Sequence, residues 1–276
     1  MSVEHDEVDP ADPAVSPLAH FGAEVRLERE RLGLSREELG KKAHCGYSLV
    51  AKIEAGQRVP TLEFAEACDA AFPHANGRFA RLRPLALRYA FPPWFRRYVE
   101  LEWTATAIRM FNAHLVPGIA QVDVYARAIL GTERPANLDD LVTARMERQR
   151  VLTRDTPPKL WLILDEGVLR RPVGGSQVMR AQLERLRTLA ESPPHVVQVI
   201  PQTVQAYPGS GCPFGLLSFR EGSDVVHVDG FPKGYVLAEP DHVAQAANAY
   251  DLLRAMALPP DKSAPLIDSI LKDGYS

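Results

Sequence analysis

Residues 35–58, SREELGKKAHCGYSLVAKIEAGQR, predict two short helices joined by a tight turn. Ser35 and Glu38 have the S-x-x-E spacing of a capping box, in which each side chain bonds a free backbone N–H at the helix start. The following His-Cys-Gly interrupts the helical periodicity, and a second helix is expected over residues 47–55. It should end at Gly56, because glycine readily adopts the left-handed conformation that closes many helices.

The second of these helices has two different faces. Val50 and Ile53, three positions apart, are expected to anchor it on its neighbours, while its polar side points outward. Two short helices with a tight turn form the helix-turn-helix unit, whose second helix fits the major groove of DNA. The sequence therefore predicts an N-terminal DNA-binding domain.

The expected DNA contacts divide into base-reading and backbone-binding residues. Small Ala51 permits close approach to a thymine methyl, Ser48 is a versatile hydrogen-bond partner, and Lys52 can reach guanine or phosphate. Arg36 in the first turn of the preceding helix, close to an N-terminus that favours phosphate, is expected to lie over the DNA backbone. The full set of expected DNA-binding residues is Arg36, Tyr47, Ser48, Ala51, Lys52, Gln57 and Arg58.

Two further helices complete the predicted domain, one over residues 18–33 and one starting at Pro60-Thr61. Helical spacing marks the residues expected to face inward. These are Phe21, Val25, Arg29 and Leu32 in the earlier helix, Leu39 and Ala43 in the helix after Ser35, and Phe64, Ala65, Cys68 and Phe72 in the later one.

Composition limits the classes of protein that this chain can belong to. The chain has 276 residues, which suggests about two domains, and its 46% hydrophobic and 24% charged residues are ordinary for a globular protein. No apolar run approaches the length of a membrane span, no signal peptide is recognised, and a cytoplasmic location is expected. The three cysteines lack metal-ligand spacing, which favours reduced thiols. Because the net charge is −3, a DNA-binding interpretation depends on where the basic residues lie.

The second half of the sequence alternates strand-like and helical segments. Strands are expected at 159–164, 196–200, 214–219, 225–228 and 234–237, with helices at 121–130, 137–153, 176–191, 241–257 and 261–272. The predicted fold class is α+β, with an all-α helix-turn-helix domain followed by a larger mixed α/β domain. The expected divisions are an acidic disordered tail (1–16), the helix-turn-helix domain (17–75), an Arg-rich connector (76–99) and the mixed α/β domain (100–276).

The connector allows two interpretations. Residues 70–99 contain six arginines and no Asp or Glu. They could form a helical linker whose arginines lie along apolar surface, or an electrostatic flank that follows DNA phosphates.

The stretch SREELGKKAHCGYSLVAKIEAGQRVPTLE resembles the Xre helix-turn-helix family, the Cro and phage-repressor type. The capping box, the turn, the I-E-x-G ending and the P-T-L-E restart occur in order, and the family's DNA-contacting positions fall on Arg36, Tyr47, Ser48, Ala51 and Lys52. One departure is His44, where the family usually has Gly. Histidine tolerates the left-handed conformation better than most residues.

The remainder resembles the C-terminal domain of the Scr1/WhiJ-like regulators, through segments such as PPWFRRYVELEWTATAIRMFNAHL and RMERQRVLTRDTPPKLWLILDEGVLRRPVGG. The resemblance covers nearly all of residues 93–272. It implies a DNA-binding regulator whose large domain receives a signal. A small acidic partner protein is one source of that signal that the resemblance suggests.

LDEGVLRRPVGG, residues 164–175, is the strongest candidate site in the large domain. Asp165 and Glu166 could act as an acid/base pair, or Arg170 and Arg171 could clamp an anion of a ligand or partner. An interdomain salt-bridge cluster is the alternative. Adjacent carboxylates on a strand point to opposite faces, which counts against joint catalysis.

No catalytic set, metal site or cofactor is predicted. His227 and Asp229 share a strand face, but two ligands do not make a zinc site. The sequence thus favours a sequence-specific transcriptional regulator that binds double-stranded DNA as a homodimer, away from membranes, with a large domain that senses a ligand or partner protein. The alternative is an antitoxin-like interaction protein that binds a small acidic partner and regulates its own operon.

Overall fold

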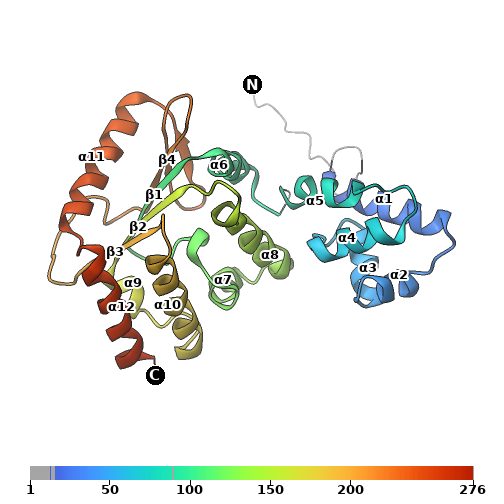
Figure 1. The fold of residues 1–276 in the computed structure, drawn as a ribbon, viewed down its shortest axis with the longest axis horizontal. Helices are drawn as coiled ribbons and strands as arrows, with labels where there is room; N and C mark the ends of the chain where they lie inside the picture. Colours follow the sequence, from blue (N-terminus) through green and yellow to red (C-terminus); the bar gives the residue numbers. More distant parts are fainter. Residues whose placement is uncertain (1–12, 14–15, 89, 276) are drawn as a thin grey trace. The chain divides into compact units, whose positions relative to one another are not determined.

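The computed structural model describes residue 13, residues 16–88 and residues 90–275, and these divide into two compact units (Figure 1). The first unit comprises residues up to Pro93 together with Asp139–Ala144, and the second comprises Trp94–Leu138 with Arg145–Ser276. The acidic tail predicted for residues 1–16 lies outside the described residues, except for Pro13 and Ser16. The side chain of Ser16 caps the first helix by accepting the Ala19 N–H (3.3 Å).

The first unit is built from short helices. They are α1 (Pro17–Arg31), α2 (Arg36–Lys42), α3 (Tyr47–Glu54), α4 (Leu62–Ala71) and α5 (Arg78–Arg88). Their apolar sides share one core, formed by Phe21, Val25, Leu39, Val50, Ile53, Phe64, Ala65, Cys68, Phe72, Ala75, Phe79 and Ala86. The inward faces predicted for these helices are therefore confirmed, apart from Leu32.

Two predicted residues near the end of α1, Leu32 and Arg29, differ in burial. Leu32 is 37% exposed because α1 ends at Arg31 and Leu32 is its C-cap. Arg29 is buried as predicted, but it is held there by an ion pair and not by apolar packing. The segment that the sequence suggested as a connector also contributes to this unit, since Phe79 and Ala86 of α5 belong to the core.

The second unit contains a six-stranded sheet. Its elements are α6 (Pro93–Thr104), β1 (Ala107–Asn112), η1 (Gly118–Ala120), α7 (Asp123–Leu130), η2 (Gly131–Glu133), α8 (Leu138–Arg148, of which Asp139–Ala144 belong to the first unit), η3 (Gln149–Thr153), β2 (Lys159–Asp165), α9 (Glu166–Arg170), α10 (Ser176–Glu191), β3 (Val196–Ile200), β4 (Phe214–Ser218), β5 (Val225–Val228), β6 (Tyr235–Leu237), α11 (Pro240–Met256) and α12 (Pro260–Gly274). The predicted fold class, a helical domain followed by a mixed α/β domain, is confirmed.

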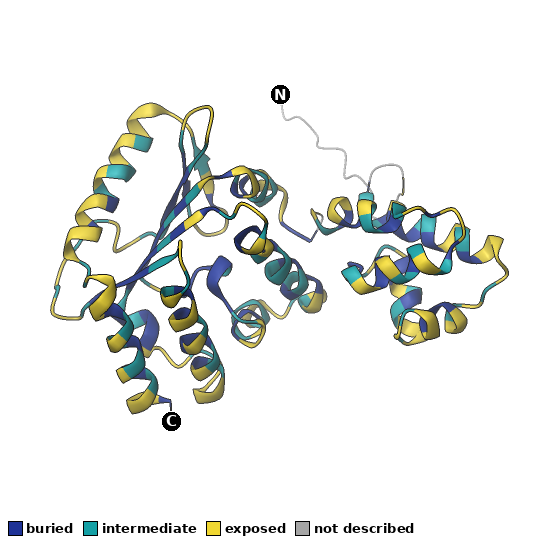
Figure 2. Cartoon of the chain, viewed as in Figure 1, coloured by how far each residue is buried: buried dark blue, intermediate teal, exposed yellow. Residues whose placement is uncertain are grey.

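The strand order is β3-β2-β1-β4-β5-β6, with β1, β2 and β3 parallel and β4, β5 and β6 antiparallel to their neighbours. The central strand β1 was not predicted, because Arg109 and Asn112 interrupt its short apolar pattern. One face of the sheet packs against helices that include α10 and α12, and the other packs against Tyr250 and Leu253 of α11. The rest of α11 is largely exposed (Figure 2).

Candidate nucleic-acid interface

Helix α3 separates an apolar side from a polar side. Val50 and Ile53 are buried at 0% and 1% exposure. Tyr47 is 56% exposed, and Ser48 and Lys52 are also exposed, while Ala51 is half-buried between the two sides. The structure thus brings the predicted α3 residues together on one accessible face.

The turn before α3 depends on residues that tolerate unusual backbone geometry. The capping box at Ser35 and Glu38 is present, with Glu38 N bonded to Ser35 Oγ (3.2 Å) and Ser35 N bonded to Glu38 Oε2 (2.7 Å). His44 has φ 51°, so it takes the left-handed conformation. A Cβ on Gly40 would lie 2.6 Å from the Cys45 carbonyl oxygen, so a side chain there would push the turn away.

A second close approach holds α3 against α1. A Cβ on Gly22 would lie 2.2 Å from the carbonyl oxygen of Ile53. The two helices therefore touch backbone to backbone at this position. Any larger residue at Gly22 would displace α3, and with it the exposed face.

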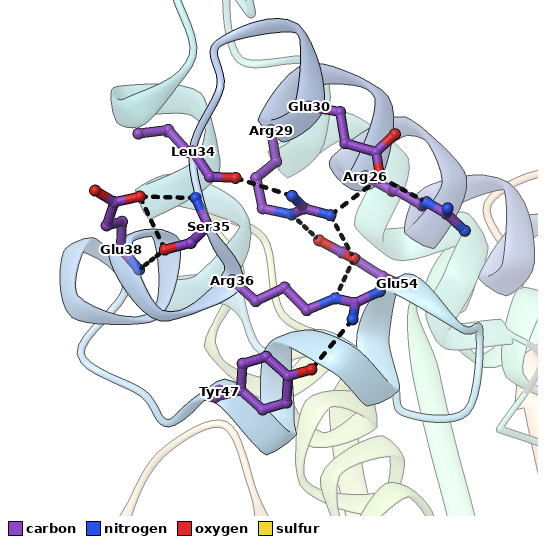
Figure 3. A network of polar contacts seen from close by, with 9 residues as sticks. All are labelled: Arg26, Arg29, Glu30, Leu34, Ser35, Arg36, Glu38, Tyr47 and Glu54. Carbon is purple, nitrogen blue, oxygen red and sulfur yellow. Dashed lines mark hydrogen bonds and ion pairs between the residues drawn. The ribbon is translucent and has the colours of Figure 1, made fainter.

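The carboxylate of Glu54, at the end of α3, is the centre of a buried polar network (Figure 3). Its side chain is 1% exposed and bonds the guanidinium groups of Arg29 from α1 and Arg36 from α2. Arg29 Nε lies 2.5 Å from Oε1, and Arg36 Nε lies 2.7 Å from Oε2. The hydrogen bonds that Arg29 and Arg36 donate to Glu54 raise the pKa of both arginines. One acid thus ties three helices together.

Arg36 also contacts the exposed face of α3. Its Nη1 donates to the Tyr47 hydroxyl at 3.3 Å, and its guanidinium carbon lies 5.9 Å from the centre of the Tyr47 ring (Figure 3). The Arg36 side chain is 31% exposed. Arg36 and Tyr47, predicted separately as DNA contacts, are therefore one contiguous surface.

The N-terminus of α2, suggested as a phosphate site beside Arg36, already carries an anion. Glu38 accepts hydrogen bonds from both the backbone N–H and the hydroxyl of Ser35, and these bonds lower its pKa. The negative charge favoured at a helix start is thus supplied internally.

Gln57 and Arg58 follow α3. Gln57 is exposed, but Arg58 is 26% exposed and forms ion pairs within the first unit. Its Nη1 lies 3.0 Å from Asp139 Oδ2, and its Nε lies 3.1 Å from Asp140 Oδ1. These partners could not be predicted from the sequence, because they lie about 80 positions away along the chain.

The arginines of α5 are largely engaged with the protein itself. Arg78 pairs with Glu24 (3.1 Å) and Glu28 (2.8 Å) on α1, and its bond lowers the pKa of Glu28. Arg83 is 2% exposed and donates to the Pro60 carbonyl (2.9 Å). These contacts favour a structural role over a phosphate-following flank for both residues.

In the second unit, Asp165 and Glu166 lie side by side but bond different partners. Asp165 caps α9 by accepting the Gly167 N–H (2.7 Å), and it also accepts from the Tyr207 hydroxyl (2.7 Å). Glu166 is buried and bonds Arg170 Nε (2.7 Å) and the Gln202 N–H (3.0 Å).

Arg171, the fourth residue of this candidate site, is exposed. The contacts of Asp165 cap the start of α9, and those of Glu166 hold the loop at Gln202, so both residues have structural roles.

His227 and Asp229 are separated by 3.7 Å between Nδ1 and Oδ1. Burial, and then the nearby Arg148, lower the pKa of His227 to about 3, so its imidazole is neutral at physiological pH. The ring stacks on Tyr98 at a centroid distance of 4.1 Å. Among the described residues, no cluster of three potential metal ligands occurs.

Comparison with protein families divides the chain at nearly the same place as the fold. Residues 20–72 match the family described as a helix-turn-helix domain, and residues 95–269 match the family described as a domain of unknown function (DUF5753). No curated protein matches the chain, and no solved structure matches it. In the described part of the chain, no helix is long and apolar enough to cross a membrane.

Proposed function

We propose that this chain, which belongs to the DUF5753 family, is a sequence-specific transcriptional regulator that binds operator DNA as a homodimer. Its helix-turn-helix domain supports a DNA-binding regulator.

The exposed face of α3 carries this proposal. Tyr47, Ser48 and Lys52 project from a helix whose opposite side is fixed in a core by Val50 and Ile53. The major groove, about 12 Å wide, accepts one such helix. Hydroxyl and ammonium groups can bond the edges of bases there, whereas Arg36 lies at the margin, where phosphates pass.

A homodimer follows from the size of the reading surface. One short recognition helix covers about half of an operator, and two-fold symmetric proteins bind two-fold symmetric sites. The expected operator is a palindrome whose half-sites lie about one helical turn apart, or a multiple of it.

We assign no catalytic step to the large domain. Asp165 and Glu166 are engaged with backbone N–H groups, Tyr207 and Arg170, which gives each carboxylate a structural task. An effector or a small acidic protein partner for this domain stays a prediction, as does the antitoxin-like role.

Selection of DNA fragments by the purified full-length chain tests the proposal. Random duplexes enriched over several rounds should converge on one palindromic motif, and the complex with that motif should contain two chains by native mass spectrometry. A library that shows no enrichment, although the chain is folded by circular dichroism, would contradict sequence-specific binding. A motif bound by a single chain would contradict the homodimer.

A further inference from the structure

Arg58 is held by two carboxylates within the first unit. Arg58 Nη1 lies 3.0 Å from Asp139 Oδ2, and its Nε lies 3.1 Å from Asp140 Oδ1. The two acids differ in burial, because the Asp139 side chain is 51% exposed and that of Asp140 is 6% exposed. Asp140 Oδ1 also accepts the Val59 N–H at 3.1 Å.

The two carboxylates reduce the positive charge that Arg58 offers to DNA. One guanidinium faces both acids, and the exposed one lies beside its Nη1. Burial raises the pKa of Asp140, and the Val59 N–H and Arg58 oppose this rise, as does Lys52 more weakly. Asp140 therefore acts on Lys52, a predicted base contact, as well as on Arg58.

We propose that Asp139 competes with a DNA phosphate for Arg58 and thereby lowers the affinity of the chain for DNA. The inference rests on the proposed function and adds a regulatory contact to the same surface. Asp140 is buried and also accepts the backbone N–H of Val59. It therefore stays in place and remains paired with Arg58. Asp139 is half exposed, and a phosphate oxygen replaces it on Nη1 when DNA binds.

A double-mutant cycle on the full-length chain tests this exchange. Dissociation constants for a mixed-sequence duplex are measured over a series of salt concentrations for the wild type, Asp139→Asn, Arg58→Ala and the double variant. Asp139→Asn should tighten binding about two- to fivefold, in the range of an exposed ion pair. It should also steepen the dependence of log K on log salt by up to about one, because Arg58 then meets phosphate without displacing an acid. In the Arg58→Ala background, Asp139→Asn should change neither quantity by more than the control does.

The matched control is Glu37→Gln, which removes an exposed acid of α2 paired with Lys41 at 3.3 Å. It measures the general effect of one fewer negative charge on this unit. Equal effects of Asp139→Asn with and without Arg58 would overturn the inference, and so would an effect no larger than that of Glu37→Gln. A folded wild-type chain that binds no duplex at low salt would instead overturn the proposed function and this inference with it.

Discussion

Arg29 and Glu54 lie 25 positions apart and join α1 to α3 through two hydrogen bonds, Nε to Oε1 at 2.5 Å and Nη2 to Oε2 at 3.1 Å. The same carboxylate bonds Arg36 of α2. The orientation of the exposed face of α3 therefore depends on a buried charge as well as on apolar packing.

Replacing Glu54 by alanine should destabilise the first unit by about 3–5 kcal/mol, because it leaves the buried Arg29 without its buried acid. Hydrogen exchange of α1 and α3 amides measures this loss, since all three tryptophans lie in the second unit and fluorescence does not report on the first. Glu37→Ala, which breaks an exposed pair, should cost no more than about 1 kcal/mol. Similar exchange rates in both variants would mean that Glu54 is not a structural centre.

Replacing Tyr47 and Lys52 together by alanine should abolish operator preference and leave the fold intact, because both side chains are exposed. Footprinting on the selected operator and on a scrambled duplex measures the preference. Ile53→Ala is the contrasting variant, since it removes a buried side chain and should cost about 2–5 kcal/mol of stability. An unchanged footprint for the double variant would contradict the assigned reading face.

Local signals explain most of what the sequence predicted. The capping box, the strained turn at His44 and the spacing of Val50 and Ile53 act within a few residues, so they can be read along the chain. Glu54 belongs to the I-E-x-G pattern in the sequence. Its role in the ion-pair network could not be predicted, because its partner Arg29 comes from another helix.

The same limit applies to other features of both units. The role of Gly22 could not be predicted from the sequence. A side chain is excluded there by the backbone of Ile53, which comes close only in the folded structure. The partners of Arg58 lie too far along the chain to be inferred. The central strand β1 was missed because a buried strand of six residues that includes Arg109 has no clear alternation.

The second unit should lose stability as pH falls from about 6.5 toward 3. The pKa of His227 is about 3 in the fold, below its ordinary value of 6.5, so the unfolded chain binds this proton first. The stabilising contribution is complete above 6.5 and is lost as pH falls through this window. Urea unfolding followed by tryptophan fluorescence measures it, because Trp94, Trp103 and Trp161 all lie in this unit.

His227→Phe retains a ring against Tyr98 and should make this decline shallower. His114→Phe, at an exposed position of the same unit, controls for the loss of an imidazole as such. A decline that is equally steep in the wild type and in His227→Phe would assign the acid sensitivity to other groups.

Arg78 should contribute to the stability of the first unit and not to DNA binding. Its guanidinium is engaged by Glu24 and Glu28, so it has little charge to offer a phosphate. Arg78→Ala should therefore speed hydrogen exchange in α1 and α5 but leave the salt dependence of DNA binding unchanged. Lys52→Ala supplies the comparison, because loss of this exposed lysine removes a phosphate contact and should reduce the salt slope. A slope reduced by about one in Arg78→Ala would restore the phosphate-following interpretation of the arginine-rich segment.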